Sequence, residues 1–484
     1  MPLSTRQSDM LDRPARSILT DFRNRSLSPV DYMTALIARV EASEPKVGAL
    51  YLFRPERALQ QARAAQERYA KGAPMGPLDG MPVTVKELIA TRGDPVPMGT
   101  AAIDLVPVPE DAPTAARLHE DGAIIFAKTT RPDYGMLSSG LSSFHPLTRN
   151  PWDLSQNPGG SSAGAAAAGA AGYGPLHVGT DIGGSVRLPA GWTGLFGFKP
   201  TQGRVPIDPY YTGRCAGPMT PTVDDAALLM QTITRPDWRD ATALPYQALD
   251  WDVPPADVHG MRIGLMLDAG CGNAPDPQVV QAVSHAARQF QNHGATVIPI
   301  APVLTRQMLD GLDHAWRARF WSMIEALPQD RRASILPYIH DWAAKGALAT
   351  PQQVAQGFDQ IFAMRRATAQ AFQQVDAILS PVNPDISYPA DQASPTNDPA
   401  RPFEHICFTV PWNMGEQPAC SIHCGLSTTG IPIGLQIVAP RFQDLRVMAL
   451  ARAFEAWRGP VTGWPRHDGH ATTESDPSVS RTTA

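Results

Sequence analysis

The first third of the chain alternates between helical and extended hydrophobic patterns. Apolar residues recur every three or four positions at Met33, Leu36, Ile37 and Val40. This spacing predicts the buried face of a helix, and Ser28 with Pro29 provides an N-cap and a first-turn proline. A second helix is predicted over about 55–70, and short apolar runs at 82–86 and 123–127 predict strands.

The later part of the chain repeats the order strand, helix, strand. Residues 262–267, about 277–293 and 295–300 form one such unit, which favours a parallel sheet. Further strands are predicted at 377–380, 419–424 and 432–438. The predicted fold class is therefore α/β, a single large body with a central mixed, mostly parallel β-sheet covered by helices on both faces.

We find no internal repeat and no linker that divides the body. The predicted organisation is an N-terminal helical segment over 1–75 and a main domain over 76–465. Within that domain, about 305–374 is helical in pattern and rich in aromatic residues, so it is expected to cover the sheet. Residues 466–484 are polar and are expected to form a disordered tail.

Composition narrows the classes of function. The 484 residues are 43% hydrophobic and 18% charged, which describes a folded chain. The net charge of −5 excludes a basic surface for nucleic acid or membrane. The uncharged stretch Asn157–Thr180 consists largely of Gly, Ala and Ser, which predicts a packed interior segment, not a membrane span. Five cysteines and a start without an apolar core predict a cytoplasmic protein.

Two glycine-rich turns carry the densest chemical signal. The runs at 158–164 and 179–187 each contain a serine, Ser161 and Ser185, 24 positions apart. Glycines before a serine allow backbone N–H groups to converge on an anion, such as the oxyanion of an acyl-transfer reaction. The alternative for the first turn is a simple cap on the alanine-rich helix that follows. No Gly-Lys-Ser/Thr sequence follows, which argues against a phosphate loop.

A serine nucleophile requires a base, and no histidine lies in these turns. Lys86 ends an apolar strand, where burial would lower its pKa and make it a base. The alternative is an ordinary solvated lysine. Cys420, His423 and Cys424 lack the paired spacing of a structural zinc site, so no metal is predicted. The residues alone indicate an α/β enzyme, with a serine hydrolase using a lysine base as the candidate.

At these positions the chain resembles the amidase signature family, the serine hydrolases with a Ser-cisSer-Lys triad. The matching phrases, in the family's order, are 76–87, 150–153, 158–164, 179–189, 217–219, 224–227, 418–421 and 430–436. The resemblance implies that Ser185 is the nucleophile, Ser161 the cis-peptide relay and Lys86 the base. It also implies an oxyanion hole formed by the backbone N–H groups of Ile182, Gly183, Gly184 and Ser185, and no cofactor.

Three residues depart from the usual family phrases. Ala163 stands where glycine is common, Glu87 where aspartate is common, and His423 where proline is frequent. None of these positions belongs to the predicted triad. The substrate loop transfers least well between members, and we take Met136, Ser138 and Ser139 as its predicted lining.

The leading functional hypothesis is a stand-alone amidase. Its binding partner would be a small-molecule substrate, an amide or carbamate (urethane), with esters as a further class. The protein itself would act as a monomer or homo-oligomer. The alternative is the A subunit of a tRNA-dependent amidotransferase, which typically carries Ser-Leu-Asp-Gln before its Gly-Pro motif. Residues 211–218 here read Tyr-Thr-Gly-Arg-Cys-Ala-Gly-Pro, which favours the hydrolase. A non-catalytic relative is disfavoured because all three triad positions are present.

Overall fold

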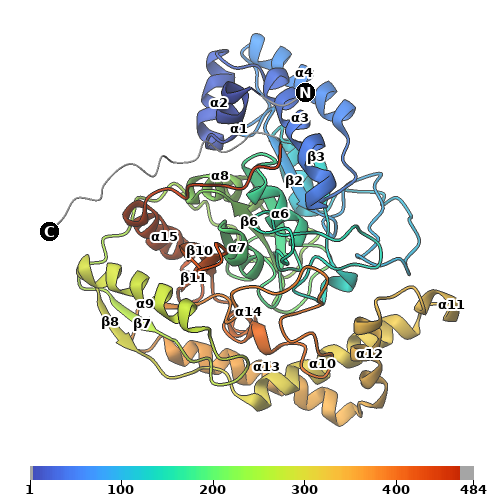
Figure 1. Cartoon of the computed structure of the whole chain (residues 1–484), viewed down its shortest axis with the longest axis vertical. Helices are drawn as coiled ribbons and strands as arrows, with labels where there is room; N and C mark the ends of the chain where they lie inside the picture. Colours follow the sequence, from blue (N-terminus) through green and yellow to red (C-terminus); the bar gives the residue numbers. More distant parts are fainter. Residues whose placement is uncertain (1–3, 469–484) are drawn as a thin grey trace.

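The chain folds around one sheet of eleven strands, shown in the computed structural model (Figure 1). The structure describes residues 4–468. In order across the sheet, the strands are β1 (Leu50–Tyr51), β3 (Ile124–Thr129), β2 (Pro82–Lys86), β4 (Leu176–Asp181), β6 (Cys215–Thr220), β5 (Phe196–Lys199), β10 (Ala419–Leu426), β11 (Pro432–Val438), β9 (Ala377–Pro381), β7 (Arg262–Leu265) and β8 (Thr296–Pro299).

The sheet is mixed, as predicted, but it is not mostly parallel. Parallel pairing joins β2 to β3 and β4, and β7 to β8 and β9. The other six pairings are antiparallel. The sequence prediction failed in the middle of the sheet, where β5 and β6 were not recognised. β6 contains Gly217 and Pro218, two residues that argue against a central strand.

Helices cover both faces of this sheet. They are α1 (Thr5–Leu11), α2 (Ala15–Asn24), α3 (Pro29–Val47), α4 (Pro55–Ala70), α5 (Pro113–Glu120), α6 (Ala163–Ala170), α7 (Arg187–Thr193), α8 (Val223–Ile233), α9 (Pro277–Asn292), α10 (Arg306–Glu325), α11 (Gln329–Arg332), α12 (Pro337–Ala344), α13 (Pro351–Ala371), α14 (Val410–Met414) and α15 (Asp444–Arg458). Short 3-10 turns are η1 (Asp133–Gly135), η2 (Lys345–Leu348) and η3 (Glu404–Ile406). Helices α10–α13 occupy the segment expected to cover the sheet and pack on one another (Figure 1).

The N-terminal segment is not a separate helical unit. Its helices α3 and α4 match the predicted helices, but β1 joins the edge of the sheet beside β3. Helix α4 is also tied to the start of β2, because Arg68 Nε donates to the buried carboxylate of Asp79 at 2.9 Å. We therefore describe residues 4–75 as part of the main body.

Helix α6 shows why the alanine and glycine run lies inside the protein. All eight of its residues are buried. A Cβ on Gly164 would clash with the carbonyl oxygen of Ala49 and the amide nitrogen of Thr130, both backbone atoms. Only small residues let the helix approach the neighbouring chain this closely. The stretch is a packed interior segment, as its composition predicts.

The predicted disordered tail lies mostly outside the described residues. Residues 469–484 are not described, whereas Arg466 contacts Asp12 and His467 contacts the backbone of Pro151. Asp468 pairs with Arg39, which is fully buried. Residues 466–468 therefore pack on the folded body, whose predicted end was residue 465.

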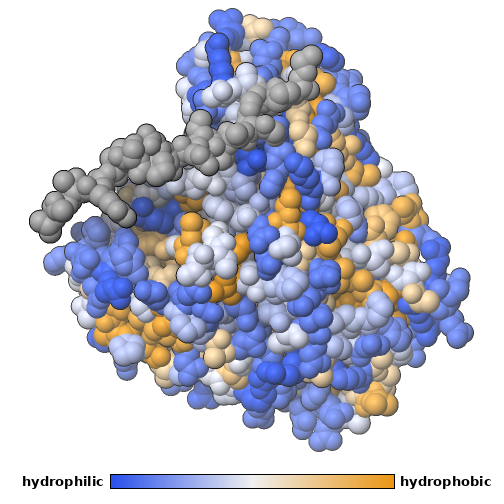
Figure 2. Space-filling view, in the orientation of Figure 1, coloured by the Kyte–Doolittle hydropathy of each residue, from blue (hydrophilic) through white to orange (hydrophobic). Residues whose placement is uncertain are grey.

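The visible surface is a mosaic of hydrophilic residues and small hydrophobic patches (Figure 2). Among residues 4–468, no helix is both long and apolar enough to cross a bilayer. The long uncharged run of the sequence is divided between α6 and β4, both of which are buried in the body.

The packing of α6 leads to a stability prediction. Gly164→Ala should lower the free energy of unfolding by about 3 kcal/mol, because the new methyl group meets backbone atoms that cannot move aside singly. Chemical denaturation would measure this loss. Gly425→Ala is the matched control, since its Cβ would be in ordinary contact, 3.6 Å from Ala282 Cβ. Equal stability of the two variants would contradict the packing argument.

Candidate active site

Lys86 is the last residue of β2, a strand that is buried along its whole length. Its side chain is 1% exposed. Its Nζ lies 2.9 Å from Ser161 Oγ and 3.0 Å from Ser162 Oγ. Burial, assisted by the charges of Arg131 and Arg214, holds the pKa of Lys86 well below its ordinary value. A lysine in this setting can be neutral near pH 7 and accept a proton.

The two adjacent serines before α6 make different contacts. Ser161 follows a cis peptide bond from Gly160 and lines a pocket together with Lys86. Ser162 Oγ instead donates to the carbonyl of Thr180 at 3.1 Å and accepts from the Thr180 N–H at 3.2 Å. Ser162 is thus held by the backbone of β4. Ser161, the serine predicted to be the relay, contacts Lys86 and lines the pocket.

Ser185 lies in the sharp turn between β4 and α7. Gly184 precedes it with φ +123°, a conformation that side-chain-bearing residues rarely adopt. The N–H of Ser162 donates to the Ser185 carbonyl at 3.2 Å, which joins the two glycine-rich turns. Ser185 is 7% exposed and lines the same pocket as Lys86 and Ser161. The structure therefore brings the three predicted residues together.

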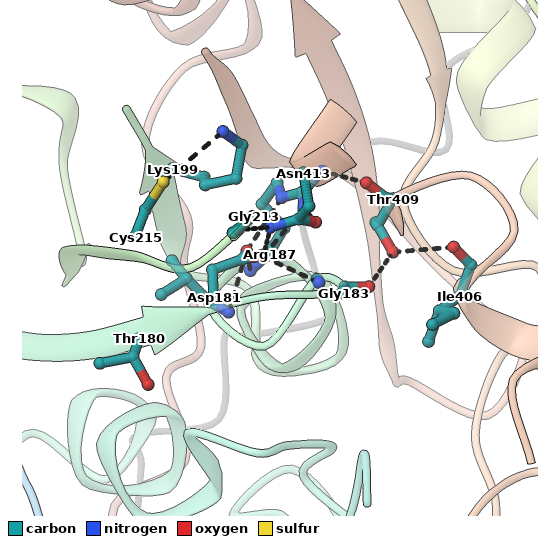
Figure 3. Close-up of polar contacts among 12 residues, drawn as sticks. Thr180, Asp181, Gly183, Arg187, Lys199, Gly213, Cys215, Ile406, Thr409 and Asn413 are labelled. Carbon is teal, nitrogen blue, oxygen red and sulfur yellow. Dashed lines mark hydrogen bonds and ion pairs between the residues drawn. The ribbon is translucent and has the colours of Figure 1, made fainter. Parts of the chain in front are cut away.

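A buried ionic network holds the Ser185 turn in place (Figure 3). The Asp181 carboxylate accepts from the N–H groups of Gly184 and Val186, at 2.8 and 3.2 Å. It also accepts from Arg187 Nε at 3.0 Å and from Asn413 Nδ2 at 2.8 Å. Burial opposes ionisation of Asp181, but the charge and hydrogen bonds of Arg187 outweigh it, so the pKa of Asp181 is lowered.

The structure differs from the predicted oxyanion hole at Gly184. Its N–H is already donated to Asp181, and Gly184 lines neither pocket at the site. Between described residues, no hydrogen bond uses the N–H of Ile182, Gly183 or Ser185. Thr409 Oγ1 donates to the Gly183 carbonyl at 2.6 Å, which orients that peptide (Figure 3). Three of the four predicted donors remain available.

Two pockets meet at Ser185. Their shared lining is Gly135, Met136, Ile182 and Ser185. The first also contains Lys86, Leu88, Met98, Arg131, Tyr134, Ser161, Thr180, Tyr211, Arg214, Arg319, Phe320 and Met323. The second is completed by Leu137, Ser138, Gly183, Trp316, Phe403, His405 and Ile406. Both therefore use side chains from α10, within the predicted helical cover.

The three predicted lining residues have different surroundings. Met136 lines both pockets, and Ser138 lines the second, where its Oγ lies 2.7 Å from His405 Nε2. Ser139 is fully buried and lines neither. Its Oγ donates to the Gln392 carbonyl at 2.7 Å. Ser139 therefore lies behind the wall of these two pockets, with its hydroxyl bridging two loops inside the protein.

Sequence reasoning missed most of the pocket wall. Arg131 follows the carboxyl end of β3, next to that of β2, and this position could have identified it because parallel strand ends share one edge. Arg214 and the α10 residues Trp316, Arg319 and Phe320 carry no local signal. They reach the pocket only through tertiary folding.

Metal-binding side chains do not gather at the site. Among residues 4–468, no three His, Cys, Asp or Glu side chains are grouped so that they could hold a metal ion. Cys420 is buried, and burial raises the pKa of its thiol. Burial likewise lowers the pKa of His423 to about 4.

Known proteins share both the sequence pattern and the fold. The A subunit of a glutamyl-tRNA(Gln) amidotransferase from Chloroflexus aggregans is 32% identical over 90% of this chain and 94% of its own. A bacterial aryl acylamidase structure superposes with a TM-score of 0.85 at 27% identity, covering 92% of this chain and 96% of its own. The glutamyl-tRNA(Gln) amidotransferase A subunit from Thermotoga maritima gives a TM-score of 0.76 at 25% identity, covering 95% and 98%.

The family model named Amidase matches residues 31–448, a span that contains the lysine, both glycine-rich turns and the helical cover. Together with the α/β fold and its eleven-stranded mixed sheet, this match shows that the chain belongs to the amidase signature family.

Proposed function

We propose that this chain is a stand-alone amidase that hydrolyses a carbon–nitrogen amide bond through an acyl-enzyme on Ser185. The observation that carries the proposal is the 2.9 Å contact between Lys86 Nζ and Ser161 Oγ, in the pocket that Ser185 lines. In this proposal, the proton of Ser185 reaches the buried Lys86 through Ser161. Small amides are the proposed substrates, and none of the relatives described above is named for a carbamate.

Acylation begins with transfer of a proton. Neutral Lys86 accepts the Ser161 hydroxyl proton while Ser161 accepts that of Ser185, and the Ser185 oxygen bonds to the substrate carbonyl carbon. The carbonyl oxygen becomes an anion that the N–H groups of Ile182, Gly183 and Ser185 stabilise.

Collapse of the tetrahedral intermediate breaks the C–N bond. Ser161 returns a proton to the leaving nitrogen and is itself reprotonated by Lys86, so a neutral amine departs. A water molecule then attacks the ester on Ser185 by the same relay. One amide and one water give one carboxylic acid and one amine.

A second candidate is the A subunit of a tRNA-dependent amidotransferase, because relatives of that name are 32% identical over 90% of the chain. The Tyr211–Pro218 segment supports the stand-alone proposal. It lacks the Ser-Leu-Asp-Gln phrase typical of those subunits, and it places Arg214 in the pocket wall.

The nucleophile assignment predicts that Ser185→Ala lowers kcat on an anilide by at least about 10³-fold, since the remaining N–H groups have no nucleophile to assist. Steady-state assays of the purified variant would measure it. Ser284→Ala, on α9 and outside both pockets, is the control and should retain parental turnover. A Ser185→Ala enzyme with more than a few per cent of parental activity would refute the assignment.

The buried base predicts a specific pH profile. Because the pKa of Lys86 is lowered, the amine is neutral above that pKa, so kcat/KM should rise with pH and level off far below 10.5. Lys86→Met should remove this limb and lower kcat/KM by about 10²–10⁴-fold. Lys128→Met is the matched control. Lys128 is a residue of β3 and pairs with Val85 of β2. It is also buried, and burial lowers its pKa to about 8, but it lies outside both pockets.

The proton relay can be separated from simple electrostatics by changing the leaving group. An amine must be protonated to leave, whereas a phenolate need not be. Lys86→Met should therefore slow amide hydrolysis more than hydrolysis of an aryl ester with the same acyl group. Equal losses on both substrates, with acylation rate-limiting, would argue against proton delivery through Ser161.

The stand-alone proposal predicts that the chain expressed alone hydrolyses amides without ATP or tRNA. A panel of aryl amides, aliphatic amides, carbamates and esters would define the range, with Ser185→Ala subtracted as background. Turnover that appears only after co-expression with the other amidotransferase subunits and a misacylated tRNA would favour the second candidate.

A further inference from the structure

The first pocket is strongly cationic. Its lining includes Arg131, Arg214 and Arg319 beside Lys86, and it includes no aspartate or glutamate. With Lys86 neutral, the pocket wall still carries the three guanidinium groups, of which that of Arg319 is on an exposed residue. The positive charge is larger than acylation requires, because the oxyanion is stabilised by backbone N–H groups.

Arg131 is the most deeply placed of the three. Its side chain is 3% exposed, and its Nε and Nη1 are buried without a hydrogen-bond partner among the described residues. It lies close to the relay. A Cβ added to Gly135 would be 2.5 Å from Arg131 Nη2 and 3.3 Å from Ser161 Oγ. Arg131 Nη2 and Ser161 Oγ therefore both lie beside Gly135, where a side chain would meet the guanidinium.

The nearest carboxylates are occupied elsewhere. Glu87 accepts from Gly99 N at 2.7 Å and from Met98 N at 3.1 Å, and it lies 3.3 Å from His145 Nε2. Asp133 accepts from Ser143 N at 2.8 Å, Ser143 Oγ at 2.7 Å and Leu336 N at 3.1 Å. Neither accepts a hydrogen bond from Arg131 Nε or Nη1. Burial lowers the pKa of Arg131, and the charges of Glu87 and Asp133 act on it only from a distance, opposing that shift. Among the described residues, Arg131 Nε and Nη1 are therefore left without a carboxylate bound directly to them.

Arg214 and Arg319 extend the same cationic wall. Arg214 Nε is also buried without a partner among residues 4–468, and burial lowers the pKa of Arg214 to about 10, so it stays charged near neutrality. Arg319, from α10, stacks on the Tyr211 ring at 3.5 Å from its centroid. Asp208, the acidic residue on the Arg214 side, is exposed and does not line the pocket.

We propose that the natural substrate is an amide that carries a carboxylate, which Arg131 and Arg214 bind in the first pocket while Ser185 attacks the amide. This inference rests on the proposed amidase function and names its substrate class. Leaving a charged group buried and unpaired is costly, and a carboxylate matches the planar fork of a guanidinium. The carboxylate can belong to the acyl half or the amine half of the substrate.

Two matched pairs of chromogenic anilides test this inference. On the amine half, the acetanilide of 3-carboxy-4-nitroaniline is compared with 4-nitroacetanilide. On the acyl half, succinyl-4-nitroanilide is compared with butyryl-4-nitroanilide. In at least one pair, kcat/KM should favour the carboxylate by about 100-fold or more, because the pocket otherwise leaves buried donors unpaired.

Arg131→Met should remove this preference. Turnover of the carboxylate substrate should fall by about 100-fold relative to its neutral partner, whereas Arg131→Lys should retain part of the preference because charge remains. Arg288→Met, an exposed arginine on α9, is the control. The melting temperature of Arg131→Met should not fall, since the Nε and Nη1 groups it removes make no hydrogen bond among the described residues.

A different role for the arginines gives a different result. If they serve only to lower the pKa of Lys86, Arg131→Met would move the acid limb of kcat/KM upward and slow both members of each pair equally. That result, or a wild-type enzyme that does not favour the carboxylate in either pair, would overturn the inference. The proposed function would still stand if Ser185→Ala abolished turnover of the neutral anilides.

Binding measurements separate failure of the inference from failure of the proposed function. Calorimetric titration of Ser185→Ala with succinate and with 3-carboxy-4-nitroaniline tests the cationic pocket without any turnover. Binding of either that is lost in Ser185→Ala/Arg131→Met supports the carboxylate site even if none of the anilides is hydrolysed. No binding of either carboxylate would overturn it, whatever the enzyme hydrolyses.

Discussion

The proposed chemistry depends on one constraint, which is that the amine of Lys86 must lose its proton while it stays buried. Lys86 achieves this at the end of a strand covered on both faces, with its Nζ held by two serine hydroxyls. Helix α6 packs on β2 and β4, and its alanines and glycines allow this close approach. The small residues of α6 and the altered pKa of Lys86 are therefore parts of one arrangement, because desolvation supplies the largest share of the shift.

The parts of the structure that sequence patterns predicted are those that interactions between neighbouring residues determine. Helices α3 and α4, the strand ending at Lys86 and the two glycine-rich turns were predicted because spacing, caps and glycines act over a few residues. The antiparallel centre of the sheet was not, since strand direction is decided by partners far away in sequence. The same reason applies to Ser139, whose hydrogen-bond partner Gln392 is distant in sequence. The contact of the Gly184 N–H with Asp181 is local, since the two residues are three positions apart, but no sequence pattern indicated it.

The predicted catalytic residues and the outer wall of the pocket come from different parts of the fold. The lysine and both serines lie at the ends of β2 and β4 and in the turn before α6, so the central sheet positions them. The outer wall comes from α10 and from the segment around η3, which contribute Trp316, Arg319 and His405. Changes in the helical cover can thus alter the pocket while leaving the relay intact, which fits a family fold that holds proteins named for different substrates.

The Asp181–Arg187 pair also shapes the electric potential behind the reacting carbonyl. An unpaired carboxylate under the Ser185 turn would repel the oxyanion from the rear. Arg187 cancels that charge, with Nε and Nη2 at 3.0 and 2.9 Å from the carboxylate oxygens. In the proposed mechanism, the N–H groups of Ile182, Gly183 and Ser185 can then attract the oxyanion without opposition from a net negative charge behind them. Asp181 can therefore brace the turn mechanically without weakening its attraction for negative charge.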